Sequence, residues 1–423
     1  MKGFRTIPEG HVTLANATVP GCMVGSEDDL TVTDISLKDG QITDAPGTRV
    51  DMARAIVMPC FSDMHTHLDK GHIWPRAANP DGTFMGALTT VGTDRSANWS
   101  ANDVATRMEF SLQCAYAHGT RAIRTHIDSL TPQDSISWPV LAAKREEWAG
   151  RIELQAASLI GCDSHHSIAD GYAGAADIVA EHNGCLGMVT YPVPDLKQRL
   201  LDFFELAGAR DLEVDFHSDE TMDPTSETLR TIAETVLELG WDKPVTVGHC
   251  CSLSTQDQAR AFDTLDLVAK AGINIVSLPM CNLYLQDRHA RVTPRGRGIT
   301  LVHEMKARGI NVSFASDNTR DPFYAYGDMD MIEVLRQSTR IGHLDHSDAD
   351  WFNAVTLNPR RAMDLDTTGL TPGAPADLVI CNARDWTELF ARPQSDRIVL
   401  RAGHAIDTSL PNYSDLDHLM ETA

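Results

Sequence analysis

Two histidines separated by one residue, His65 and His67, are the first side chains along the chain that could bind one metal together. They follow the apolar run Ala55–Phe61, which is typical of a buried strand. On a strand, residues i and i+2 point to the same face, so both imidazoles could reach a single ion. This pair alone is weak evidence for a metal site, and it becomes convincing only if other parts of the chain supply further ligands.

Three more apolar runs end in residues of the same kind. They are followed or closed by His217, by His249 and by Ser316-Asp317-Asn318. Imidazoles together with a carboxylate suit Zn²⁺ or Fe²⁺, whereas Mg²⁺ and Ca²⁺ prefer oxygen ligands. The alternative is that these are core or supporting residues placed by chance, and that must hold at four strand ends together. We therefore predict one divalent metal, Zn²⁺ or Fe²⁺, bound by His65, His67, His217 and Asp317.

The remaining charged groups suggest a hydrolytic reaction. A bound cation lowers the pKa of a water toward about 7. Asp317 has a second oxygen that could accept the proton of this water. Glu220, three residues after His217, could carry a proton to a substrate nitrogen as a general acid–base group. His249 is either a further ligand or a group that polarises an oxygen, and we favour the second role.

These residues need a scaffold that brings several strand ends to one place. Eight apolar runs alternate with helical patterns such as Asn102–His118, Ser226–Leu239, Gln256–Ala271 and Leu301–Arg308. Several helical patterns end in a glycine suited to a helix C-cap, namely Gly119, Gly240, Gly272 and Gly309. The predicted strands are Ala55–Phe61, Thr120–Ile127, Ile152–Leu159, Cys185–Tyr191, Leu212–His217, Pro244–His249, Gly272–Leu278 and Gly309–Ala315. The alternation predicts an α/β fold, a (β/α)₈ TIM barrel, with an open doubly wound sheet as the alternative.

Both ends of the chain are rich in short β segments. His11–Val19 and Leu30–Leu37 lie in the first part, and Ala376–Ile380 and Arg397–Arg401 lie in the last. We predict that residues 1–56 and 370–423 meet in a small β-sandwich domain, and that residues 57–369 form the barrel with the metal site.

Composition excludes several classes of partner. The 423 residues carry 36 Lys and Arg against 59 Asp and Glu, a formal net charge of −23. This charge argues against nucleic acid and anionic membranes as partners. No run reaches the roughly 18 apolar residues of a membrane span, and the N-terminus shows no signal-peptide pattern. The nine cysteines form no CxxC pair, so we expect free thiols and a cytoplasmic protein.

Six segments then point to a known family. The chain resembles the amidohydrolase superfamily, and within it the bacterial cytosine deaminase branch. The segments are Pro59–Lys70, Arg124–Asp128, His217–Glu220, Val247–Cys250, Asn282–Thr300 and Ala315–Gly327. The resemblance implies a (β/α)₈ barrel with a small β domain from both termini. It implies that His65, His67, His217 and Asp317 are metal ligands, that Glu220 is the proton shuttle and that His249 assists the attacking water. It also implies a homo-oligomer.

Differences from that branch concern the residues expected to read the substrate. Binuclear relatives bridge two metals with a Lys at the end of strand four, which this chain lacks, so one metal is expected. Cytosine deaminases carry a Gln where this chain has Gly161, an Asp where it has Asn318 and a Trp where it has Phe323. The other candidates for substrate contact are Phe84, His126 and Gln286. Asp69-Lys70 is predicted to be a buried ion pair that supports the site, and His165, His166, His343 and His346 are predicted surface residues.

Three functions follow from these observations. The first is a mononuclear metal-dependent aminohydrolase that releases ammonia from a small N-heterocycle, such as cytosine, a 5-substituted cytosine or a related ring. The alternative is an amidohydrolase acting on a cyclic amide or on an N-alkylamino, triazine-like ring. The third is an inactive barrel used for binding, against which the intact ligand set argues.

Overall fold

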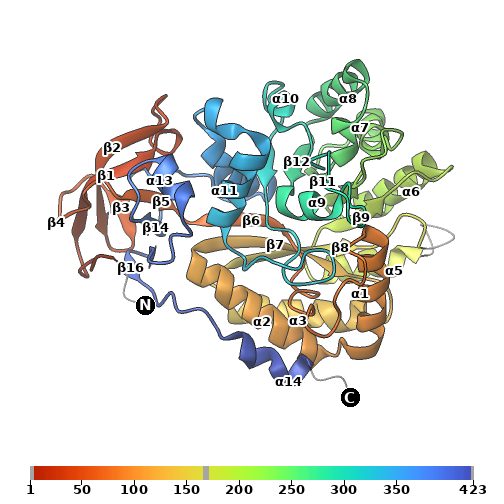
Figure 1. Ribbon diagram of the computed structural model, residues 1–423, viewed down its shortest axis with the longest axis horizontal. Coiled ribbons are helices and arrows are strands. Elements are labelled where there is room, and N and C mark those ends of the chain that lie inside the picture. The colour runs from red at the N-terminus through yellow and green to blue at the C-terminus, as the bar shows by residue number, and fades with distance from the viewer. Residues whose placement is uncertain (1–3, 165–170, 421–423) are drawn as a thin grey trace.

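A closed barrel of parallel strands forms the centre of the molecule. The computed structural model describes residues 4–164 and 171–420, and within them eight strands line the barrel (Figure 1). They are β6 (Phe61–Thr66), β7 (Thr120–Asp128), β8 (Glu153–Leu159), β9 (Leu186–Thr190), β10 (Val214–Ser218), β11 (Val245–His249), β12 (Asn274–Ser277) and β13 (Val312–Phe314). The runs β6–β8 and β9–β13 are joined by parallel bridges between Gly161 and Val189 and between Thr66 and Asp317. The predicted (β/α)₈ class is confirmed, and the doubly wound alternative is excluded.

Helices follow most of the barrel strands and cover the outside. They are α1 (Phe84–Asn98), α2 (Ala101–His118), α3 (Asp134–Glu147), α5 (Ala173–Glu181), α6 (Leu196–Ala209), α7 (Thr228–Leu239), α8 (Gln258–Ala271), α9 (Pro279–Leu285), α10 (Val302–Lys306), α11 (Met331–Gly342) and α12 (Leu357–Ala362). Ser100 caps α2 by accepting a hydrogen bond from the backbone of Asp103. Gly119 ends the same helix with a φ of 94°, a left-handed conformation that favours glycine. Gly240 and Gly272 end α7 and α8 in the same way, as predicted.

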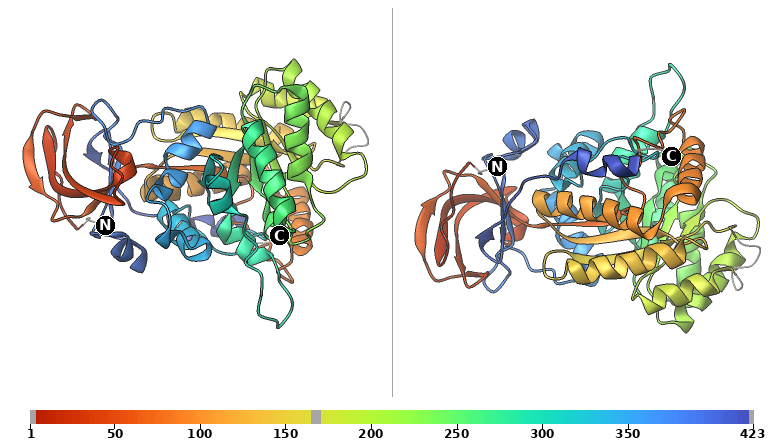
Figure 2. Two further views of the ribbon diagram at one scale, coloured as in Figure 1. Left: turned by 90° about the horizontal axis from the view of Figure 1, so that it is seen from above. Right: turned by 90° about the horizontal axis from the view of Figure 1, so that it is seen from below.

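Strands from both ends of the chain form a separate sheet beside the barrel (Figure 2). The strands are β1 (Val12–Pro20), β2 (Leu30–Lys38), β3 (Gln41–Thr43), β4 (Thr48–Asp51), β5 (Ile56–Pro59), β14 (Leu378–Cys381), β15 (Ile398–Arg401) and β16 (His404–Ala405). Their order is β16-β15-β14-β5-β1-β2-β3, with β4 paired to β1. The short helices α13 (Trp386–Ala391) and α14 (Asp417–Met420) complete the C-terminal part.

The prediction that Ala55–Phe61 is the first barrel strand is wrong. Residues Ile56–Pro59 form β5, which pairs with β14 in the terminal sheet, and the first barrel strand is β6. The apolar run continues without a break through Cys60, where the chain passes from one sheet to the other, so hydrophobicity alone could not show the change. The division into 1–56 plus 370–423 and 57–369 stays a prediction, and the pairing of β5 favours a boundary after Pro59.

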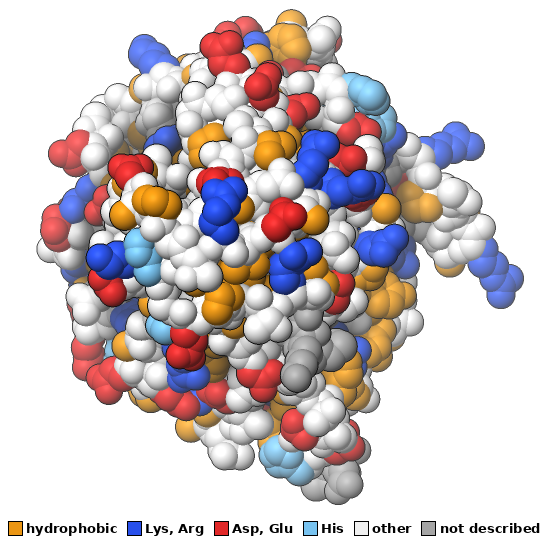
Figure 3. Space-filling model, turned by 90° about the vertical axis from the view of Figure 1, so that its left-hand side faces the viewer, with side chains coloured by type: hydrophobic (Ala, Val, Ile, Leu, Met, Phe, Trp, Pro, Cys, Tyr) orange, Lys and Arg blue, Asp and Glu red, His pale blue; other side chains and the backbone are white. Residues whose placement is uncertain are grey.

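Charged side chains of both signs are interspersed on the face that the terminal sheet presents (Figure 3). Among the described residues, no helix is both long and apolar enough to cross a membrane.

An ion pair connects the C-terminal segment to the barrel, and it leads to a prediction about stability. Two nitrogens of Arg397 lie 2.7 and 2.6 Å from the carboxylate of Asp330, which also caps α11 by accepting from the backbone of Ile332. Burial alone would raise the pKa of Asp330, but Arg397 and His118 hold it well below its ordinary value. Asp330→Asn keeps a capping oxygen and removes the charge, so we expect about 3 kcal/mol of lost stability at pH 7.

The pH dependence of this loss has a defined sign. A carboxyl whose pKa is depressed by folding stabilises the fold above its unfolded pKa of about 4, and that stability is lost as the pH falls toward the folded value. Thermal melts should therefore separate the wild type and Asp330→Asn at pH 6–7, and the separation should shrink below about pH 4. An equal separation across this range would contradict the assignment.

Candidate active site

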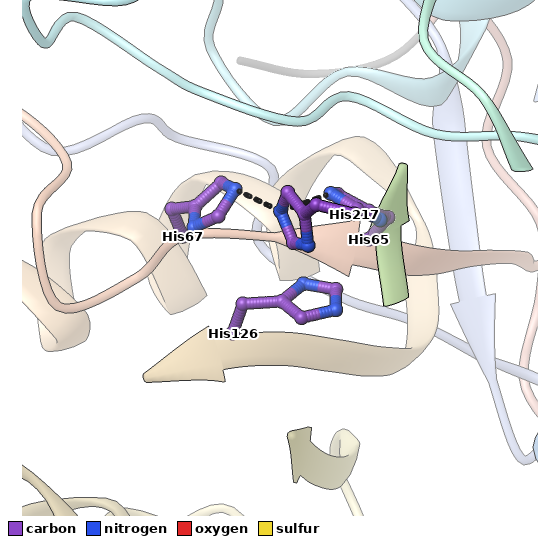
Figure 4. A group of neighbouring side chains, drawn as sticks. All are labelled: His65, His67, His126 and His217. Atoms are coloured by element: carbon purple, nitrogen blue, oxygen red, sulfur yellow. Dashed lines mark hydrogen bonds between the residues drawn. The ribbon is translucent and has the colours of Figure 1, made fainter. Parts of the chain in front are cut away.

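The four predicted metal ligands meet at one end of the barrel. His65 lies on β6 with His67 just after it, His217 lies on β10, and Asp317 follows β13. The Nε2 atom of His217 is 3.1 Å from Nε2 of His65 and 3.4 Å from Nε2 of His67. Oδ1 of Asp317 is 3.1 Å from Nε2 of His67 and 3.6 Å from Nε2 of His65. Figure 4 shows the three imidazoles pointing toward one another.

These distances fit a shared metal ion. Two ligand atoms that each lie about 2.1 Å from one ion at a tetrahedral angle are about 3.4 Å apart. Burial, followed by the neighbouring charged groups, holds the pKa of His65, His67 and His217 well below the usual value, so each ring is neutral and has a lone pair to offer. Both carboxylate oxygens of Asp317 are buried without a hydrogen-bond partner. The donor set suits a borderline cation such as Zn²⁺ or Fe²⁺.

His126 lies against this cluster, with its ring next to those of His65 and His217. Its ring centre is 4.1 Å from that of His65 and 4.6 Å from that of His217. Its Nε2 is 3.0 Å from Oδ1 of Asp215, and its Nδ1 is buried without a partner. His126 can also join His65, His67 and His217 as a metal-capable group. The prediction that it contacts substrate is not supported by this position.

Glu220 and His249 lie beside the cluster. Oε1 of Glu220 is 3.5 Å from Nδ1 of His249. Burial first, and then the charge of Asp317, raise the pKa of Glu220 well above its ordinary value. The side-chain amide of Asn282 donates to Nδ1 of His249 at 2.9 Å. Because Nδ1 accepts, the proton of the neutral ring is on Nε2, which is buried without a partner and can donate into the site.

The backbone around these groups is held in uncommon conformations by a network of side chains. Asp219, His249 and Asp317 have φ values of 52°, 71° and 63°. The carboxylate of Asp219 accepts from Ser226, from both the N–H and the hydroxyl of Thr228, and from Leu229. These bonds fix the segment that carries Glu220, and strain of this kind is frequent at functional sites. Sequence reasoning missed Asp219 and Asn282 as positioning residues.

A cavity of about 240 Å³ opens beside the metal ligands. Its size is below the range of about 300–1,000 Å³ that is usual for drug-sized ligands, so a small ring is the better fit. Apolar side chains and polar or charged ones line it in nearly equal number, with charged groups at the metal ligands and at one further place. The cavity is lined by His67, Lys70, Phe84, Leu88, Val91, Gly92, Arg95, Asp128, Leu130, Leu159, Ile160, Gly161, Ser164, Val189, Tyr191, His217, Glu220, His249, Asp317, Asn318 and Phe323.

The predicted substrate residues divide into two groups. Phe84, Gly161, Asn318 and Phe323 line the cavity, and the rings of Phe84 and Phe323 meet edge to face with centres 5.4 Å apart. Gln286 does not line it, because its amide donates to the backbone oxygen of Glu220 at 3.1 Å. Outside the cavity, His343 and His346 are exposed as predicted, whereas His165 and His166 lie outside the described residues.

Sequence reasoning missed one feature of the cavity wall, the face of α1 that follows Phe84. Leu88, Val91 and Arg95 follow Phe84 on one face of α1 at intervals close to a helical turn, a periodicity that could have shown them. Lys70 pairs with Asp128 at 3.1 Å, which corrects the predicted Asp69–Lys70 pair.

Comparisons with known proteins agree with this geometry. The family described as "Amidohydrolase family" matches residues 136–406. A pterin deaminase of Rhizobium rhizogenes is 52% identical over 419 residues, which covers 96% of this chain and 95% of the relative. The structure of 5-methylcytosine deaminase from Klebsiella pneumoniae with 5-fluorocytosine aligns with a TM-score of 0.79 at 26% identity, covering 93% of this chain and 97% of that one. N-isopropylammelide isopropylaminohydrolase from Burkholderia multivorans shares the fold, with a TM-score of 0.71 at 22% identity and coverage of 95% and 100%.

Proposed function

Because this chain belongs to the amidohydrolase family, we propose that it is a divalent-metal-dependent aminohydrolase that removes the 2-amino group of a pterin. The observation that carries the proposal is the convergence of His65, His67, His217 and Asp317 beside Glu220 on one small cavity. The 52% identity to a pterin deaminase favours a pterin over the cytosine expected from the sequence. One metal, Zn²⁺ or Fe²⁺, is part of the proposal.

The residues of the site account for each proton in the reaction. A cation held by these four ligands supplies the Lewis acidity that activates water at neutral pH. Asp317 accepts a proton from the attacking water through its free oxygen. Glu220, protonated because of its raised pKa, gives a proton to the ring nitrogen beside the amine-bearing carbon. His249 donates from Nε2 to the oxygen that adds to this carbon. Glu220, now ionised, takes the remaining proton from the added hydroxyl group and delivers it to the amino group, so that ammonia leaves and an oxo group remains on the ring. The proton held by Asp317 then returns Glu220 to its acid form.

Gly161 forms part of the cavity wall, and its surroundings leave no room for a side chain at that position. A Cβ at Gly161 would lie 2.8 Å from both Oη of Tyr191 and Oγ of Ser164. These two side chains therefore occupy the space that a longer side chain at position 161 would need, such as the glutamine that the resemblance to cytosine deaminases implies there. A flat ring can approach the wall there, but it finds no amide partner from residue 161.

Gly161→Gln should reduce turnover of pterin without removing the metal. The added side chain must displace Tyr191 or enter the cavity, where it meets bound substrate. If this steric conflict costs about 1–3 kcal/mol of transition-state binding, kcat/KM falls about 5–150-fold. Steady-state kinetics and metal analysis would measure both effects. Gly174→Gln is the matched control, because a Cβ at Gly174 meets nothing within 4 Å. Unchanged kcat/KM in Gly161→Gln would show that substrate does not use this wall.

The substrate class is tested by ammonia release. Metal-loaded protein is incubated with pterin, cytosine, 5-methylcytosine and an N-isopropylamino-triazine, with ammonia and isopropylamine measured separately. We expect rapid ammonia release from pterin. Release of ammonia from the pyrimidines alone, or of isopropylamine from the triazine alone, would overturn the assignment to pterins. The homo-oligomeric state and the cytoplasmic location stay predictions.

A further inference from the structure

A buried charged group lies in the cavity wall and has no part in the reaction just described. Lys70, which is 4% exposed, lines the same cavity as Glu220 and His249. Its ammonium lies 3.1 Å from Oδ1 of Asp128, while Oδ2 of Asp128 lies 2.9 Å from Nη1 of Arg95. The backbone N–H of Asp128 donates to Oδ2 of Asp69 at 2.8 Å. Asp128 is thus fixed from three sides.

Lys70 keeps its charge in this place. Burial would lower the pKa of Lys70, but Asp128, Asp69 and Asp321 together raise it above the ordinary value. The ammonium also lies 5.5 Å from the ring centre of Phe323, another residue of the cavity wall. An ammonium carries three N–H donors, so the bond to Asp128 leaves donors for another partner.

A purely structural role explains Lys70 poorly. The pair of Arg95 and Asp128 already connects α1 to the end of β7, and it does so without Lys70. A buried charge at a cavity wall is costly unless it makes good hydrogen bonds. Because Lys70 and Glu220 line the same cavity, a ring whose amine-bearing carbon meets Glu220 can reach Lys70 with another of its atoms.

We propose that Lys70 is a specificity-determining residue, which donates a hydrogen bond to the ring oxo group of the substrate, and that Asp128 positions it. The inference rests on the proposed function, since it takes a pterin as the substrate. Gly161 leaves the wall without the amide that reads the ring in cytosine deaminases, and Lys70 supplies a donor elsewhere in the same wall. In pterin the acceptor is the oxygen at position 4.

The test compares pterin with 2-aminopteridine, which has the same reacting amine but lacks the oxygen at position 4. Wild-type kcat/KM should favour pterin by about 10–150-fold, the value of a hydrogen bond to a charged donor. Lys70→Met should lower kcat/KM for pterin by the same factor of about 10–150. The kcat/KM for 2-aminopteridine should change by less than about threefold. Lys70→Arg should keep a preference for pterin. Lys270→Met, at an exposed position of α8, is the matched control.

The outcomes separate this inference from the proposed function. Equal kcat/KM of the wild type for both compounds would overturn the role of Lys70 while leaving the deaminase proposal intact, and it needs no variant to fold. Equal loss on both compounds in Lys70→Met would also overturn it, since a supporting role predicts that result. No ammonia from either compound with metal-loaded wild type would instead mean that the proposed function is wrong.

Discussion

Glu220→Gln will lower kcat for deamination by about 10²–10⁴-fold, the usual contribution of a positioned general acid–base group. Glutamine has nearly the same shape but cannot carry a proton to the ring nitrogen or to the leaving amine. Glu220 is separate from the four ligands, so the variant should bind as much metal as the wild type. Steady-state kinetics with pterin and elemental analysis would measure the two properties on the same preparation.

Glu238→Gln is the matched control for this variant, because Glu238 lies on the outside of α7 with a side chain that is 58% exposed. It should keep the wild-type rate. Wild-type turnover in Glu220→Gln would contradict the proton-shuttle role. Loss of metal in that variant would show that Glu220 holds the ion, and the division of roles within the site would then be wrong.

Removal of the metal, by chelation or by His217→Ala, should lower the rate of turnover by at least about 10³-fold. Activation of water by a cation supplies several kcal/mol, and each 1.4 kcal/mol is about tenfold in rate. Zn²⁺ or Fe²⁺ added back to the chelated wild type should restore the activity at one ion per chain. It should also raise the Tm, because an ion that binds only the folded state stabilises that state.

His217→Ala should show neither recovery nor a rise in Tm at the same metal concentration. His346→Ala is its control, because the side chain of His346 is 94% exposed and His346 is not one of the predicted ligands. Full activity of a chain shown to be metal-free would contradict the central role of the metal. Two ions per chain in the active protein would contradict the mononuclear site.

Much of the fold could be predicted because its signals are local. Glycines after helical patterns mark helix ends, and Gly119, Gly240 and Gly272 take the left-handed conformation there. The metal ligands could be predicted for a related reason. In a parallel barrel all carboxyl ends of the strands meet at one rim, so residues that end different strands are brought together without any knowledge of packing.

Other features depend on contacts that sequence patterns do not contain. β5 belongs to the terminal sheet because it pairs with β14, which lies more than 300 residues later in the chain. His126 and Gln286 lie near the expected strand ends, but their side chains bond to Asp215 and to the backbone of Glu220 rather than facing the cavity. Lys70 pairs with Asp128 rather than with Asp69, because the side chains of consecutive residues point in different directions. Side-chain direction in a loop is a tertiary property.

The fate of the water oxygen is the most direct evidence for or against hydrolytic deamination. Metal-loaded protein is incubated with pterin in ¹⁸O-labelled water, and ammonia and the ring product are quantified together. We expect one ammonia for each pterin consumed and a 2,4-dioxopteridine product that carries the label from water in the new oxo group. Consumption of pterin with ring opening, or a product without the label, would contradict hydrolytic deamination, and so would the absence of any reaction with pterin.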